Sequence, residues 1–183
     1  MATDTKERIL RGAIELAADN DSIQGVTISL ESVARQAGLT KPGLMYHFPT
    51  KEALMVGLVE YAARRWHDLL REHCGAEPET LTAFERTRAY VTVWTTASVS
   101  RADYWIFTDA QYHPRLAQEW HRNLSPWNDV EGLPGEVRSL LTAARFCADG
   151  AWMSEATGVF RADDLAAVRL HALGLVDAAE GLS

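Results

Sequence analysis

The strongest constraint on the fold lies in residues 29–54, SLESVARQAGLTKPGLMYHFPTKEAL, where signals for helix starts and a helix stop follow at short intervals. Ser29 can cap a short amphipathic helix that Gly38 closes, because a helix end commonly needs a residue in the left-handed conformation. Thr40 can cap a second short helix, and a long helix follows. Two short helices joined by a tight turn predict a helix-turn-helix over about residues 29–48.

The second short helix has an unusual start, because its first turn contains Pro42 and Gly43, the residue types that least favour a helix interior. Proline in the first turn removes no intrahelical hydrogen bond, since the first N–H groups of a helix have no partner within it. Glycine leaves room for close approach to the DNA groove in which such a helix lies. We interpret this helix start as suited to contact with DNA, with stability supplied by the neighbouring helices.

The distribution of charge permits such a contact. The net charge of −7 by itself argues against nucleic acid as a partner. From Ser32 to Lys51, however, there is no Asp or Glu, and a local basic face can bind phosphate on an acidic protein. The predicted DNA-binding residues are Ser29, Thr40, Lys41, Pro42, Gly43, Met45, Tyr46, His47 and Lys51.

These residues are expected to play two different roles. Phosphate contacts position a protein on DNA, and only base contacts read the sequence. Base reading is expected from Lys41, Pro42, Gly43 and Met45, and phosphate contact from the other residues, while Lys41 can reach a guanine edge or a phosphate. A structural alternative stands beside this interpretation, in which Ser29 and Thr40 only cap helices while Tyr46 and His47 only pack against the first helix.

The remainder of the chain also predicts helices, so we expect an all-α fold. Apolar residues recur at helical spacing in residues 5–19, in the long segment 51–74 and in five later segments. The β-branched run YVTVWTTASV (90–99) could form a strand, but no other segment offers it a partner, and we reject that alternative. The composition changes at GAEPET (75–80), which separates an N-terminal module from a larger C-terminal one.

Length and composition exclude several classes of protein. The chain has 183 residues, of which 47% are hydrophobic and 23% charged, as in an ordinary globular protein. No apolar run approaches the roughly 18–20 residues that span a bilayer, and the polar start MATDTKERIL is no secretory signal. Cys74 and Cys147 lie far apart, which fits a reducing compartment better than a disulfide scaffold, although a bond between them stays open. We expect a cytoplasmic protein with no membrane partner.

The segment SLESVARQAGLTKPGLMYHFPTKEAL resembles the DNA-binding signature of the TetR family of bacterial transcriptional regulators. The resemblance extends back through RILRGAIELA (8–17) and covers residues 5–54. One position departs from the pattern, because family members often have Tyr where this chain has Met45. Tyr46 matches a Tyr-His-Phe subgroup of the family.

The resemblance implies an all-helical homodimer in which three N-terminal helices bind double-stranded operator DNA and a fourth connects them to a divergent C-terminal domain. We accordingly expect a helix-turn-helix DNA-binding domain over residues 1–54 and a helical ligand-binding and dimerisation domain over residues 55–183. The function that follows is a repressor that a small lipophilic ligand releases from a palindromic operator. An activator, or a regulator that answers a neutral lipid-like or lactone ligand, is the alternative within this class.

Aromatic residues are concentrated in the C-terminal part, where all six tryptophans follow residue 65. Such side chains on several helices can line a pocket for a flat organic ligand, or they can form an ordinary core. Acidic residues lie among them, and a buried carboxylate among aromatic rings suits a lipophilic cation. The candidate ligand-binding residues are Trp94, Trp105, Phe107, Asp109, Trp120, Phe146, Asp149 and Trp152. Their spacing also resembles a multidrug-responsive actinobacterial branch of the family.

The last two predicted helices, 134–157 and 162–180, carry many small residues beside an apolar stripe. Small residues permit close helix approach, so these two helices can form a four-helix interface between two copies of the chain. The alternative is that both stripes are buried within one chain. On the resemblance we favour a homodimer through the last two helices.

Sequence patterns typical of catalysis or cofactor binding are missing. The chain contains no G-x-S-x-G, H-E-x-x-H, Walker or G-x-G-x-x-G pattern. His67 and His73 fall on different helix faces, and His113 and His121 lie too far apart to share one ion. We therefore expect no catalytic residues, no metal and no cofactor, and hence no enzyme. A small helical enzyme or metal-binding protein that carries the motif, or an interaction scaffold, is the alternative.

Overall fold

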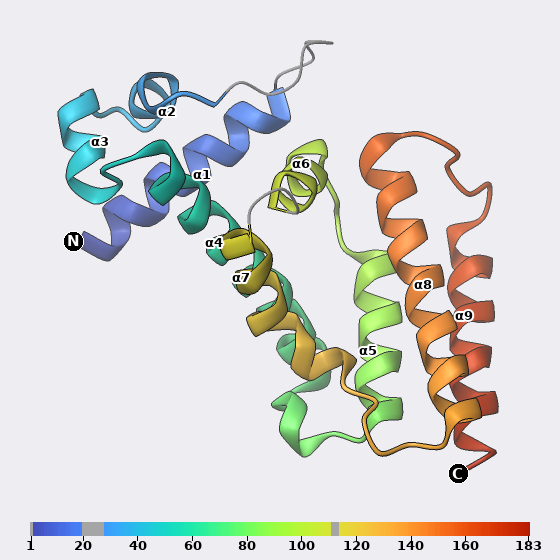
Figure 1. The fold of residues 1–183 in the computed structure, drawn as a ribbon. Coiled ribbons are helices and arrows are strands. Elements are labelled where there is room, and N and C mark those ends of the chain that lie inside the picture. The colour runs from blue at the N-terminus through green and yellow to red at the C-terminus, as the bar shows by residue number, and fades with distance from the viewer. Residues whose placement is uncertain (1, 20–27, 111–113) are drawn as a thin grey trace. The chain divides into compact units, whose positions relative to one another are not determined.

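The computed structural model describes residues 2–19, 28–110 and 114–183 of the chain. Over these residues it contains the helices α1 (Ala2–Asp19), α2 (Leu30–Gln36), α3 (Lys41–His47), α4 (Lys51–Cys74), α5 (Ala83–Thr96), α6 (Arg101–Ala110), α7 (Pro114–Leu124), α8 (Gly135–Thr157) and α9 (Leu165–Glu180), and the short 3-10 helices η1 (Pro78–Thr80) and η2 (Ser125–Asn128). The described residues contain no strand, which confirms the predicted all-α fold (Figure 1). No helix in this described part is long and apolar enough to cross a membrane.

Local side-chain chemistry explains where the short helices begin and end. The Ser29 hydroxyl accepts a hydrogen bond from the Ser32 N–H at 3.0 Å, and the Thr40 hydroxyl accepts one from the Gly43 N–H at 3.2 Å. Gly38, just after α2, has a φ of +66°, the left-handed conformation in which glycine carries no Cβ penalty. The predicted helix starts and the predicted stop are therefore present.

The β-branched run in residues 90–99 lies mostly in α5, which ends at Thr96, so rejecting the strand was correct. Threonine normally competes with a helix for backbone hydrogen bonds. In α5 its hydroxyl groups instead donate to carbonyl groups one turn earlier, at 2.8 Å from Thr92 to Arg88 and 2.7 Å from Thr95 to Val91. The polar atoms are thereby satisfied inside the helix.

The structure divides into two compact units, of which the first comprises Met1–Arg64 and Ser100–Trp120. Its core is formed by side chains from α1, α2, α3 and α4, and the fully buried ones include Ile9, Val33, Leu44 and Leu54. At Gly57 on α4 the packing is close, because an added Cβ would be 2.7 Å from the ring of Phe48. The residue that follows α3 is thus packed directly on α4.

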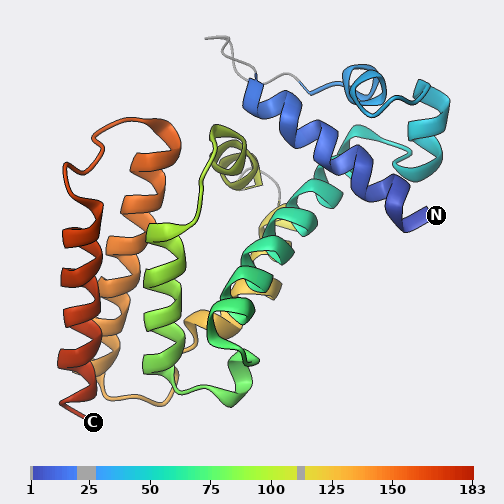
Figure 2. The same ribbon diagram turned by 180° about the vertical axis from the view of Figure 1, so that it is seen from behind.

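The second unit comprises Arg65–Val99 and His121–Ser183, and its main body is the three helices α5, α8 and α9 side by side (Figures 1 and 2). Arg88 on α5 joins the first of these helices to the last, because its guanidinium lies 2.7 Å from a carboxylate oxygen of Asp177 and 2.6 Å from one of Glu180. Helix α4 belongs to the first unit up to Arg64 and to the second from Arg65. The expected domains, residues 1–54 and 55–183, divide the chain by function and stay a prediction.

Candidate functional site

Helix α3 has one face in the core and one face in solvent. Leu44 is fully buried and Phe48, the C-cap residue, is 7% exposed, so these two side chains hold the helix down. On the other face Tyr46 is 85% exposed and Met45 is 40% exposed. An aromatic ring this exposed contributes little to a core, so the fold alone does not explain Tyr46. His47 lies between the two faces and is half-buried.

The start of α3 combines a cap with a restriction on side-chain size. The N–H of Gly43 donates to the hydroxyl of Thr40, and a Cβ on residue 43 would be 3.2 Å from the same oxygen. Glycine at this position therefore also keeps the cap undisturbed, a role that the sequence interpretation missed. Thr40 is exposed, and its hydroxyl still has a hydrogen to donate to an acceptor outside the chain.

A third capped helix start lies at α4, where the Thr50 hydroxyl accepts from the Ala53 N–H at 3.0 Å. Thr50 precedes the exposed Lys51, so a hydroxyl, a helix N-terminus and an ammonium group occur together. Such a group is suited to bind a phosphate oxygen. Thr50 was absent from the predicted DNA-binding residues, although threonine before lysine at a helix start was a signal for it.

The exposed charges between Ser32 and Lys51 are positive, and the exposed carboxylates of Glu31 and Glu52 flank this segment. Arg35, Lys41 and Lys51 are all exposed, while the segment from Ser32 to Lys51 contains no carboxylate. Ser29, at the start of α2, is also exposed, but its hydroxyl already bonds with Ser32 in a capping box. The structure therefore offers exposed hydroxyl, ammonium and guanidinium groups on α2, α3 and the start of α4.

An aromatic cluster in the second unit forms a second candidate site, which we define as Trp66, Tyr90, Trp94, Trp152 and Asp149. The rings of Tyr90 and Trp94 are stacked, with centroids 3.9 Å apart and planes 18° apart. Trp66 lies 4.4 Å from Trp94 and 6.3 Å from Trp152, measured between ring centroids. Three of the predicted ligand residues, Trp94, Asp149 and Trp152, thus belong to one group, and its other members, Trp66 and Tyr90, were not among the predicted residues.

The carboxylate of this cluster has a polar and a charged neighbour. The Tyr90 hydroxyl donates to Oδ1 of Asp149 at 2.6 Å, and Nη1 of Arg145 lies 3.7 Å from Oδ2. Burial raises the pKa of Asp149 above its ordinary value, and it outweighs the opposing effects of Tyr90 and Arg145. The same burial, with the charge of Asp149, raises the pKa of Tyr90. The Asp149 side chain is 36% exposed, so it lies at the edge of the cluster.

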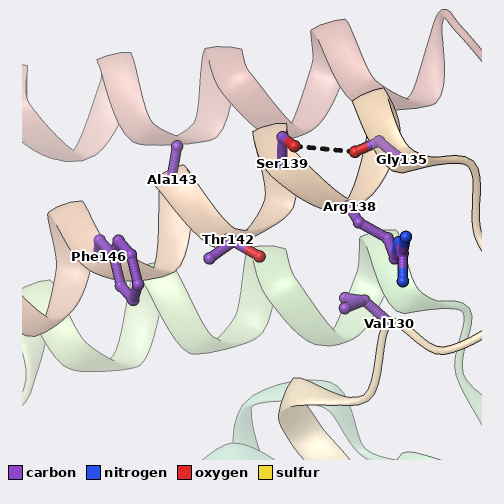
Figure 3. A pocket seen from close by; sticks show the side chains of 7 residues that line it. All are labelled: Val130, Gly135, Arg138, Ser139, Thr142, Ala143 and Phe146. Atoms are coloured by element: carbon purple, nitrogen blue, oxygen red, sulfur yellow. Dashed lines mark hydrogen bonds between the residues drawn. The ribbon is translucent and has the colours of Figure 1, made fainter.

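The other predicted ligand residues lie elsewhere in the structure. Phe107 and Trp120 belong to the first unit and form an edge-to-face pair with centroids 5.5 Å apart, and Trp105 is half-buried in α6. Phe146 is 60% exposed on α8, where it lines a shallow depression of about 510 Å³ together with neighbouring α8 residues and Val130 (Figure 3). The side chain of Asp109 lies outside the described residues.

Comparison with known proteins agrees with this arrangement. A family model described as "Bacterial regulatory proteins, tetR family" matches residues 9–58, and one described as "Tetracyclin repressor-like, C-terminal domain" matches residues 85–177. The second match alone covers more than half of the chain. A search of curated proteins found no match.

Several solved structures share the fold. A TetR-family transcriptional regulator from Rhodococcus sp. is 15% identical with a TM-score of 0.69, over 96% of this chain and 98% of that chain. A TetR-family member from Streptomyces coelicolor A3 is 20% identical with a TM-score of 0.65, over 94% and 98%. The multidrug binding protein EbrR, complexed with ethidium, is 19% identical with a TM-score of 0.62, over 93% and 98%. Taken with the capped helix-turn-helix and the two family matches, these findings show that the chain belongs to the TetR family of bacterial transcriptional regulators.

Proposed function

We propose that this chain is a homodimeric repressor that binds a palindromic operator through α3 and is released by a small lipophilic cation. The observation that carries the proposal is the exposed face of α3. Tyr46 is 85% exposed and Lys41 at the helix start is also exposed, while Leu44 and Phe48 are buried and anchor the helix. A rigidly held short helix with an exposed basic and aromatic face is suited to enter a major groove.

Within this proposal the exposed residues divide by chemistry. Base edges are read by the α3 side chains near the helix start, Lys41, Pro42, Gly43 and Met45. Phosphate is bound by the hydroxyl and basic groups around them, Ser29, Thr40, Tyr46, His47 and Lys51, to which we add Thr50. The capped N-terminus of α4 supports this assignment, because a helix N-terminus attracts anions.

The homodimer is supported by an uncovered apolar face on α8 and α9. Phe146, Met153 and Leu170 are 60%, 46% and 69% exposed. Gly150 and Gly174 lie inside the same two helices, and a Cβ on either would meet nothing within 4 Å. Glycine inside a helix is less stable than alanine by about 0.5–1 kcal/mol, so packing within one chain does not explain these glycines. Close approach of a second copy does explain them.

The ligand class is supported by the aromatic cluster. The four rings of the cluster are only 1–7% exposed, and the Asp149 carboxylate lies at their edge, so a flat cation that parts these rings would meet apolar surface and a negative charge. EbrR, which shares the fold, is described as a multidrug binding protein and was crystallised with ethidium and with malachite green. A neutral lipid-like ligand would gain nothing from the charge of Asp149, so we favour the cation.

Release requires that ligand and operator prefer different conformations of the protein. The change in operator affinity has to equal the ratio of ligand affinities for the two conformations. We propose that helix α4 couples the ligand site to the operator-binding site, because it carries Lys51 at its start and Trp66 of the aromatic cluster further along. A ligand that shifts Trp66 acts on the same helix that carries the phosphate-binding end.

The test is a titration of the purified protein against the DNA that flanks its own gene, with random competitor DNA and at two salt concentrations. We expect protection of a palindromic sequence that competitor does not remove. Tyr46→Ala should weaken this binding, whereas Phe160→Ala should leave it unchanged, because Phe160 is 93% exposed and lies in the second unit. Binding that competitor removes completely, or an equal effect of the two variants, would contradict the assignment of α3.

A further inference from the structure

We propose that Arg145 is a built-in competitor for the cation site of the aromatic cluster, so that its guanidinium holds the place of the ligand's positive charge and has to be displaced. This inference rests on the proposed function, because it takes the carboxylate of Asp149 to be the group that binds the cation. It adds a residue that determines which ligands can bind.

The position of Arg145 matches the chemistry expected of a lipophilic cation. Its Nη1 atom lies 3.7 Å from Oδ2 of Asp149, and its guanidinium carbon lies 4.8 Å from the ring centroid of Phe146. A carboxylate and an aromatic face are the two groups that attract an organic cation in a partly dry site. Arg145 therefore contacts the carboxylate of the cluster and, outside the cluster, the exposed ring of Phe146.

The ion pair between Arg145 and Asp149 is long compared with the ion pairs of Arg88 in the same unit. Arg88 approaches Asp177 to 2.7 Å and Glu180 to 2.6 Å, within the usual range of a charge-assisted hydrogen bond. Arg145 stays about 1 Å further from its carboxylate, although the two arginines are similarly exposed, at 35% and 33%. Arg145 thus makes no close charge-assisted hydrogen bond to the Oδ2 atom of Asp149.

The balance of charge at Asp149 leads to the same conclusion. Burial keeps the pKa of this carboxyl raised even with the Tyr90 hydroxyl at 2.6 Å and Arg145 nearby. The raised pKa means that the ionised form of Asp149 is less favourable here than in water. A cation that lies closer to the carboxylate than Arg145 does would stabilise that form.

This arrangement selects among ligands. A cation has to displace the guanidinium of Arg145, which is 35% exposed in one copy of the chain, from Asp149. A neutral ligand cannot replace the guanidinium, since it would leave the carboxylate without a counter-charge. The apparent affinity for a cation is lowered by the fraction of molecules in which Arg145 occupies the position.

The test measures the dissociation constant of ethidium, a flat fluorescent cation, for the full-length protein and its variants. Arg145→Gln should tighten ethidium binding about two- to fivefold, the factor expected for removing a partly exposed ion pair. Arg145→Lys, which keeps the charge, should bind like the wild type. Asp149→Asn should weaken binding, and adding Arg145→Gln to it should have no further effect, because no carboxylate remains to compete for.

The possible failures are distinguishable. If ethidium binding is weakened by Asp149→Asn but is unchanged or weakened by Arg145→Gln, the competitor role is wrong while the ligand site stands. If Arg145→Gln tightens binding equally in the Asp149→Asn background, its effect does not pass through the carboxylate, and the inference is also wrong. If neither the wild type nor Arg145→Gln binds ethidium, the proposed cation site fails, and this inference fails with it. Thermal unfolding of each variant confirms that it is folded.

Discussion

Replacing Gly57 by alanine tests whether Phe48 sets the position of α3. An added Cβ would be 2.7 Å from Cε1 and 3.2 Å from Cζ of the Phe48 ring, and 3.3 Å from Cδ2 of Leu10. Ordinary contact begins at 3.4 Å, so the ring has to move by about 0.7 Å, the difference between 3.4 and 2.7 Å. Phe48 is the C-cap residue of α3, and its movement is therefore passed to that helix.

Two opposing terms set the change in stability. Overpacking a well-filled core typically costs about 1–3 kcal/mol, whereas alanine in place of a helix-interior glycine gains about 1 kcal/mol. We expect the free energy of unfolding to fall by about 0–2 kcal/mol. Operator affinity should fall at least about fivefold, which corresponds to the roughly 1 kcal/mol of one misaligned base contact. No DNA-contacting side chain is altered, so this loss would come from the position of α3 alone.

Urea unfolding measures the stability of the Gly57→Ala variant, and fluorescence anisotropy with labelled operator measures its affinity. The control is Phe48→Leu in the same background, because a smaller side chain makes room for the new methyl group and should restore part of both quantities. A Gly57→Ala protein that is about 1 kcal/mol more stable than the wild type, with unchanged operator affinity, would refute the reasoning. It would mean that the ring turns aside without moving α3.

Three further predictions concern charge, packing and protonation. Lys51→Ala should weaken binding to all DNA sequences and reduce the slope of log K against log salt concentration by about 1. Titration at several salt concentrations measures this slope, and an unchanged slope would exclude a phosphate contact. Gly174→Ala should stabilise helix α9 by about 0.5–1 kcal/mol yet weaken the proposed homodimer. Analytical ultracentrifugation measures the dissociation constant of the dimer, and an unchanged constant would argue against close approach of a second copy at Gly174. Burial raises the pKa of Asp149 in the folded protein above the ordinary value of 3.8, which we take for the unfolded chain. The free energy of unfolding therefore falls as the pH rises from the unfolded pKa through the folded pKa, because the charged carboxylate is less stable in the folded protein. Asp149→Asn should therefore unfold at the same or a higher temperature than the wild type at pH 7, with the difference lost below about pH 4. A variant that melts much lower only at pH 7 would show that the charged form is needed.

The helix-turn-helix could be predicted from sequence because its determinants are local. A cap such as Ser29 or Thr40 acts on an N–H three residues away, and the left-handed Gly38 acts on the turn that it closes. Local chemistry of this kind is the same wherever the segment lies in the molecule. The number and order of the helices followed in the same way from apolar periodicity, and the structure places the β-branched run in α5 as expected.

The roles of individual aromatic residues depended on packing between distant segments. Trp127 in η2 is 1% exposed, and its Nε1–H donates to Nδ1 of His67 at 3.0 Å. No local pattern relates two residues sixty positions apart. The grouping of Trp66, Trp94 and Trp152 is of the same kind, since the three rings come from α4, α5 and α8 and meet only when those helices pack.

By itself, therefore, the sequence determined the helices, their caps and the DNA-binding motif, because interactions within about four residues are sufficient to specify them. Only the tertiary structure decided which side chains share an environment. It placed Phe48 against Gly57, set Tyr90 and Arg145 on either side of the Asp149 carboxylate, and left the apolar face of α8 and α9 uncovered. Helix packing depends on how whole surfaces fit together, and that information is spread over the entire chain.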